Sequence, residues 1–118
     1  MDIERVRTYC LEKKACNESF PFDDTTLVFK VIDRIFAVVS LDYPNHVCLK
    51  CEPQYSIDLR ERYDGIFGAP HFNKKHWNQV DFEKDVPDSL ILSLIDHSYD
   101  EVLKKFTRKQ KAQYDELP

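Results

Sequence analysis

The sequence predicts an α+β domain in which a mostly antiparallel sheet packs against helices on one side. Three observations favour this class: a helical pattern at the start, a succession of strand-like runs in the middle, and one long amphipathic segment near the end. Strands that follow one another, instead of alternating with helices, are typical of antiparallel sheets. At 118 residues, one domain with one core is expected.

The first element is a helix that Asp2 can cap. Apolar residues recur at three- and four-residue intervals through Val6 and Cys10, which predicts an amphipathic helix ending near Lys14. Residues 17–24 read as a turn.

Two strands follow, at residues 27–32 and 35–41, because both runs are rich in β-branched and aromatic residues. We expect Asp33-Arg34 to connect them as a hairpin, with Asp33 in an unusual backbone conformation because the turn contains no glycine or asparagine. A short third strand is predicted over residues 47–51.

The next elements are a helix and another pair of strands. Pro53 suits the first turn of a helix, and Asp64-Gly65 suits its end. Alternation over residues 77–82 predicts a strand, and Ile66-Phe67 is the candidate start of its partner.

The strongest helical pattern begins at Pro87 and extends to Phe106, with apolar residues on one arc and polar residues opposite. We expect about five turns. Residues 1–106 therefore form the predicted domain, and residues 107–118 form a basic and then acidic tail that is expected to fray.

The charge balance disfavours general attraction to polyanions. The formal net charge is −4 and the pI is near 5.5, so a role with nucleic acid would need a local basic patch. The four cysteines would permit two disulfides, but the chain starts without a recognisable export signal, so we expect a reducing cytoplasm. No apolar run approaches the ~20 residues of a membrane span.

The cysteine pair Cys48 and Cys51 has the CxxC spacing of zinc and redox sites. Alternation within a strand sends the two side chains to opposite faces, however, so we interpret them as structural thiols. No metal site and no cofactor are predicted.

The four histidines are interpreted as solvated or singly hydrogen-bonded. General acid–base chemistry by His71 or His76 stays open, but the sequence supplies no visible partner for either ring. There is no GxSxG motif, glycine-rich phosphate loop or dinucleotide fingerprint, so a non-enzymatic role is favoured.

Residues 70–79 contain the only tryptophan, Trp77, and the adjacent cations Lys74 and Lys75. An aromatic ring beside cations and amides suits contact with phosphates or bases. Trp77 could equally anchor the core beneath the sheet. The basic residues near the chain end are explained by a helix C-terminus and a solvated tail.

Several segments, in order, resemble the MmcQ/YjbR-like family over nearly the whole chain. They are DTTLVFKV at residues 24–31, FA and SLD at 36–37 and 40–42, LKCEP at 49–53, HFNKKHWN at 71–78 and LIDHSYD at 94–100. The Asn-Lys-x-His-Trp-Asn and Ser-Tyr-Asp pieces are the most specific.

The resemblance implies a small bacterial cytoplasmic protein with an α+β fold and a double-wing DNA-binding motif, with no established catalytic residues. DNA is then the expected partner, and the candidate contact residues are His71, Asn73, Lys74, Lys75, His76, Trp77 and Asn78. The alternative is a module that binds a protein or a small molecule, with the sheet face and this segment lining a pocket.

Overall fold

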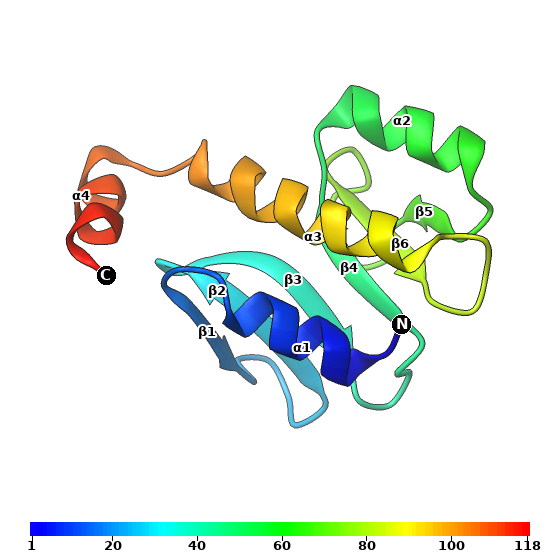
Figure 1. The fold of residues 1–118 in the computed structure, drawn as a ribbon, viewed down its shortest axis with the longest axis horizontal. Coiled ribbons are helices and arrows are strands. Elements are labelled where there is room, and N and C mark those ends of the chain that lie inside the picture. The colour runs from blue at the N-terminus through cyan, green and yellow to red at the C-terminus, as the bar shows by residue number, and fades with distance from the viewer.

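The computed structural model describes all residues, 1–118, and confirms the predicted α+β class (Figure 1). Four helices accompany one six-stranded sheet. In chain order the elements are α1 (Ile3–Leu11), β1 (Cys16–Ser19), β2 (Thr26–Val31), β3 (Arg34–Ser40), β4 (His46–Lys50), α2 (Pro53–Arg62), β5 (Ile66–Gly68), β6 (Trp77–Asp81), α3 (Asp88–Leu103) and α4 (Arg108–Glu116).

The sheet has the strand order β1-β2-β3-β4-β6-β5, and every neighbouring pair is antiparallel. Helices α1 and α3 lie on the same side of it, α3 against β3 and β4 and α1 against β1 and β4, while α2 lies by β5 (Figure 1). No helix covers the opposite side, which we call the open face. The predicted one-sided packing of helices is therefore confirmed.

Strand alternation divides the apolar residues between two clusters. The helix-covered side holds a core of 20 buried residues, including Phe29, Phe36 and Ile95. The open face has a smaller cluster of Val28, Val38, Cys48 and Ala69, against which Phe72 and Trp77 pack. The loop after β5, rather than a helix, covers these apolar side chains on the open face.

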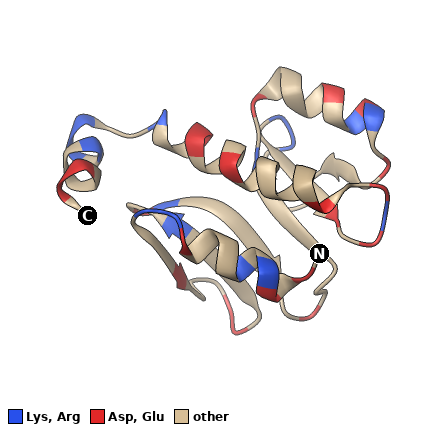
Figure 2. Cartoon of the chain, viewed as in Figure 1, with Lys and Arg blue, Asp and Glu red and all other residues tan.

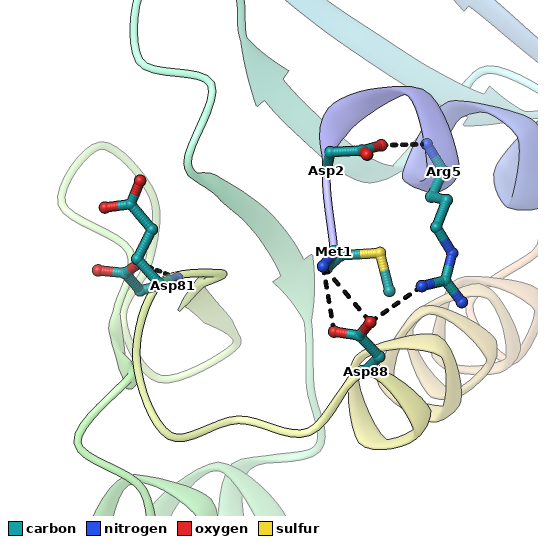
Figure 3. A network of polar contacts seen from close by, with 6 residues as sticks. Met1, Asp2, Arg5, Asp81 and Asp88 are labelled. Atoms are coloured by element: carbon teal, nitrogen blue, oxygen red, sulfur yellow. Dashed lines mark hydrogen bonds and ion pairs between the residues drawn. The ribbon is translucent and has the colours of Figure 1, made fainter.

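The start of the chain is tied to α3 by charge. Asp2 caps α1 by accepting from the Arg5 amide at 2.8 Å, as predicted. The Met1 amino group and the Arg5 guanidinium both contact the Asp88 carboxylate, at 3.2 and 2.9 Å (Figure 3). These ion pairs join the first turns of the two helices that cover the sheet.

Two strand predictions need correction. The segment of β1, Cys-Asn-Glu-Ser, has no β-branched or aromatic residue, so the sequence predicts a turn there. It is a strand instead, because it pairs with β2 at the edge of the sheet. The hairpin turn is Ile32-Asp33, one residue earlier than predicted. Asp33 has a positive φ of 66°, as expected, but so does Ile32, at 44°.

The prediction that the chain end frays was also wrong. Residues 108–116 form α4, whose first turn has a capping box between Thr107 and Gln110. Tyr114 packs on Phe106, and its hydroxyl lies 2.9 Å from that of Tyr99. Side-chain contacts that the charge pattern does not reveal therefore hold the final helix.

Candidate functional site

Residues 69–76 form a loop between β5 and β6 that folds back on itself. The Ala69 amide donates to the Trp77 carbonyl at 3.1 Å, and the His76 amide donates to the Asn73 carbonyl at 3.0 Å. The Asn73 side chain accepts from the Lys75 amide at 3.0 Å, which closes an Asx turn. The loop thus has internal support while four predicted contact residues stay exposed: His71, Asn73, Lys74 and Lys75.

Arg60 of α2 fastens this loop to the sheet. Its Nε donates to Asn78 Oδ1 at 2.7 Å, and Nη2 donates to the carbonyls of Lys74 and Trp77. Asn78 is buried, and its Nδ2 donates to Ser56 Oγ at 3.2 Å. Since both ends of the amide are used inside the protein, we leave Asn78 out of the contact surface. It faces the covered side, whereas Trp77 faces the open one.

Trp77 is half-buried on the open face. Its ring stacks on Phe72, with ring centres 4.9 Å apart and planes inclined by 26°. Lys50 lies directly opposite Trp77 in the neighbouring strand β4, so both side chains point to the same face. The indole therefore packs against the sheet while it keeps a surface beside a cation.

Four lysines lie at this end of the sheet, and we call them, with Trp77, the basic end. Lys30 and Lys50 project from the open face, whereas Lys74 and Lys75 stand in the loop that leads into β6 and line a groove beside Pro53 and Arg60 of α2. None of the four forms an ion pair. Burial lowers the pKa of Lys50, and the nearby charges of Lys105 and Arg34 lower it further against the opposing effect of Glu101.

The structure does not gather the four histidines at one site: His46 and His71 line the same pocket on the open face, and His97 lies on α3. His71 is exposed, His76 is half-buried, and neither imidazole has a hydrogen-bond partner in the chain that could orient it. His97 accepts from the Glu52 amide at 3.1 Å and packs edge-on against Tyr55. Burial lowers the pKa of His46. The arrangement offers no histidine with an orienting acid or base partner.

Cys48 and Cys51 diverge as predicted. Cys48 belongs to the open-face cluster and Cys51 to the main core. Burial raises the pKa of Cys48 to about 12, so the thiol form dominates at neutral pH. Nowhere in the chain do three His, Cys, Asp or Glu side chains gather closely enough to hold a metal ion.

The other end of the open face contains a pocket of about 560 Å³, which we call the open-face pocket. Its floor is formed by Val38, Cys48 and Gln79 of β3, β4 and β6. Three loops build its wall: residues 20–25 before β2, residues 41–45 between β3 and β4, and the 69–76 loop. Aromatic rings stand in each of these loops: Phe22, Tyr43 and Phe72.

Comparison with known proteins identifies the protein family. Residues 11–101 match the YjbR family, which is more than half of the chain. The protein belongs to the YjbR family. The resemblance seen in the sequence is thereby confirmed, and residues 71–78, its most distinctive piece, form the loop and strand start that carry Lys74, Lys75 and Trp77.

Relatives and solved structures agree on this lineage. The uncharacterised protein YjbR of Escherichia coli K12 is 30% identical over 112 residues, covering 94% of this chain and 95% of the relative. The uncharacterised protein YbdF of Escherichia coli O157:H7 is 28% identical, covering 92% and 89%.

Among solved structures, Deinococcus radiodurans DR2400, described as a DUF419 domain, is 36% identical with a TM-score of 0.88, covering 98% of this chain and 88% of that one. A Pseudomonas syringae protein is 24% identical with a TM-score of 0.72, covering 86% and 98%, and shows the same fold. None of the four descriptions states an activity or a ligand.

Sequence reasoning missed most of the open-face pocket. The sequence pattern does not indicate Phe22 or Tyr43, contains Asp42 only within the family-like segment at 40–42, and places Asp23 in a predicted turn. The one available signal was the presence of large aromatic side chains in turn segments, where Phe22 is 65% and Tyr43 is 70% exposed.

Proposed function

We propose that the protein is a non-enzymatic DNA-binding module that contacts phosphates through the basic end of its sheet. The observation that carries this proposal is that four lysines without ion-pair partners lie at the end of the sheet where Lys50 faces Trp77. A lysine ammonium group binds a phosphate as a point charge, and an adjacent ring can stack on a base or a sugar. The acidic balance of the whole chain does not oppose contact at one local patch.

The sheet topology supports two wings. The hairpin β2–β3 carries Lys30 and Arg34, and the hairpin β5–β6 carries Lys74 and Lys75 in its connection. Strand β4 lies between them and contributes Lys50. Figure 2 adds that Lys and Arg also mark the end of α3 and the start of α4. We propose that the basic residues of both hairpins contact phosphates of the DNA backbone.

Anisotropy of a labelled DNA duplex at about 50 and 150 mM salt tests the proposal. Changing both Lys74 and Lys75 to Glu should weaken binding more than about tenfold, because two phosphate contacts become repulsive. The melting temperature should stay unchanged, since both side chains are exposed.

A matched double variant, Lys109→Glu with Lys111→Glu, alters the charge of α4 by the same amount and should bind nearly as well as the unaltered protein. If this variant loses binding while the Lys74 and Lys75 variant keeps it, the interface lies on α4 and the proposal is wrong. It is also wrong if the unaltered protein does not bind DNA at the lower salt concentration.

A second candidate function is the binding of a small molecule or a peptide, and the open-face pocket favours it. About 560 Å³ lies within the usual range of ligand sites. This function uses the opposite end of the open face and does not require the lysines. None of the four helices has the length and apolar character needed to cross a bilayer.

A further inference from the structure

The lining of the open-face pocket has a distinctive charge pattern. Its 15 residues include two carboxylates, Asp23 and Asp42, and two imidazoles, His46 and His71, but neither a lysine nor an arginine. Burial lowers the pKa of His46, which favours its neutral form and so limits how far this imidazole offsets the carboxylates. An anionic ligand would therefore enter a region of negative potential.

The two carboxylates differ in how they are held. Asp23 accepts from the amides of Thr25 and Thr26 at 2.9 and 2.7 Å, and these hydrogen bonds lower its pKa and keep it ionised. Asp42 forms neither a hydrogen bond nor an ion pair within the chain. The pocket thus has one fixed negative charge and one carboxylate that is available to a ligand.

Aromatic rings complete the pattern. Phe22, Tyr43 and Phe72 each come from a different loop of the pocket wall, and Val38 adds an apolar floor. The negative face of an aromatic ring attracts a cation, most strongly where water is partly excluded. Carboxylates and rings therefore select the same ligand charge by two separate mechanisms.

We infer that the open-face pocket binds an organic ammonium ion that carries a compact apolar body, with Asp42 contacting the ammonium group and the rings enclosing the rest. This inference rests on the second candidate function, a pocket that takes a ligand, and it is independent of DNA binding. A free amine and the side chain of a lysine share this chemistry. The pocket volume favours the free amine, since it accommodates a whole small molecule.

The test uses three probes of similar size: phenethylamine, which is cationic, phenethyl alcohol, which is neutral, and phenylacetate, which is anionic. Amide chemical shifts of the full chain are followed by NMR during each titration. The amide signals of Thr25, Cys48 and Gln79 should shift progressively as the phenethylamine concentration rises. The alcohol should bind more weakly, and phenylacetate should not bind. Nα-acetyl-lysine amide, as a fourth probe, should bind more weakly than phenethylamine; tighter binding would assign the site to a peptide lysine instead.

Asp42→Asn should weaken the binding of phenethylamine at least about threefold, as expected for the loss of one charge contact in a partly enclosed site. Asp24→Asn is the matched control, because Asp24 is an exposed neighbour of Asp23 that does not line the pocket. If Asp24→Asn weakens the amine as much as Asp42→Asn, the attraction is general to the acidic surface and the inference is wrong.

Two further outcomes separate the inference from the function beneath it. Phenylacetate or the alcohol binding as tightly as the amine, with shifts at Cys48 and Gln79, would keep a ligand pocket but overturn the selection of cations. Failure of every probe to shift these amides at millimolar concentration would overturn both.

Discussion

The two ends of the open face differ in charge although the same strands connect them. At the end with Trp77, four lysines stand without carboxylate partners. At the other end, Asp23 and Asp42 stand in a pocket without a single Lys or Arg. In Figure 2, the loop before β2 and the turn between β3 and β4 carry acidic residues, away from the basic marks at the end of α3 and on α4.

This difference teaches that a sheet face need not act as one surface. Antiparallel strands bring loops of different composition to their two ends, and each set of loops determines the chemistry of its own end. The net charge of −4 averages over both ends and describes neither. Phe72 lies between them, because it stacks on Trp77 and also lines the pocket.

The largest expected effect comes from Arg60→Ala, which removes the support that both ends share. Asn78 is buried and would lose the charged donor to its Oδ1, so we expect the free energy of unfolding to fall by about 2–3 kcal/mol in urea denaturation. DNA and amine binding should weaken together, because the 69–76 loop supplies Lys74 to one end and Phe72 to the other.

Arg62→Ala is the control for this change. Arg62 is an exposed residue on the same helix, and its loss should alter stability by no more than about 0.5 kcal/mol. A variant at Arg60 that is as stable as the one at Arg62 would show that the loop does not depend on this anchor.

Asp42→Lys should convert the acidic end into an extension of the basic end. We expect tighter DNA binding and a salt dependence that is steeper by up to about 0.9 in log–log slope, corresponding to one more phosphate contact. Phenethylamine binding should disappear in the same variant. An unchanged salt slope would show that DNA does not reach this end of the face.

Local sequence pattern predicted the elements whose own residues determine their conformation. The apolar period of α3, the Asp2 cap and the proline at the start of α2 all led to helices at the observed places. The sequence pattern does not predict strand β1 or helix α4, because contacts with neighbouring elements determine their conformation. Strand β1 pairs with β2, and Tyr114 of α4 contacts Phe106 and Tyr99. Tertiary contact overrides composition in both segments.

The candidate site was predictable only in part, for the same reason. Residues 71–77 could be singled out because Trp77 and the lysines are close together in the sequence. Their alignment with Lys30 and Lys50 depends on strand order and register, which one sequence does not reveal. The open-face pocket requires three loops, residues 20–25, 41–45 and 69–76, that are separated along the chain by whole strands or longer segments, so no local motif marks it.

A smaller effect is expected from Asp33→Gly at the tip of the β2–β3 hairpin. Asp33 has a positive φ of 66°, which glycine adopts without steric cost, so unfolding should require about 0.5–1 kcal/mol more free energy. Amine binding should not change, because the hairpin tip does not line the pocket.

Asp33→Asn removes the same charge but keeps a side chain, so it should give less than half of the gain in thermal unfolding. Equal gains in the two variants would assign the effect to charge at the basic end rather than to backbone strain.

The smallest effect is the contribution of the acidic end to stability in acid. Hydrogen bonds from Thr25 and Thr26 lower the pKa of Asp23 in the folded state. A lowered folded pKa means that this contribution is complete above the unfolded pKa, near 3.9 for an aspartate, and is lost as the pH falls through the folded value.

Asp23→Asn should therefore lower the melting temperature slightly at pH 7 and by a shrinking amount below about pH 4. Asp24→Asn removes a carboxylate without such hydrogen bonds, and its effect on melting should vary less with pH. If the Asp23 variant and the unaltered protein kept a constant difference down to pH 2, the loop before β2 would not owe its order to the ionised carboxylate, and the fixed charge assigned to the pocket would have to come from Asp42 alone.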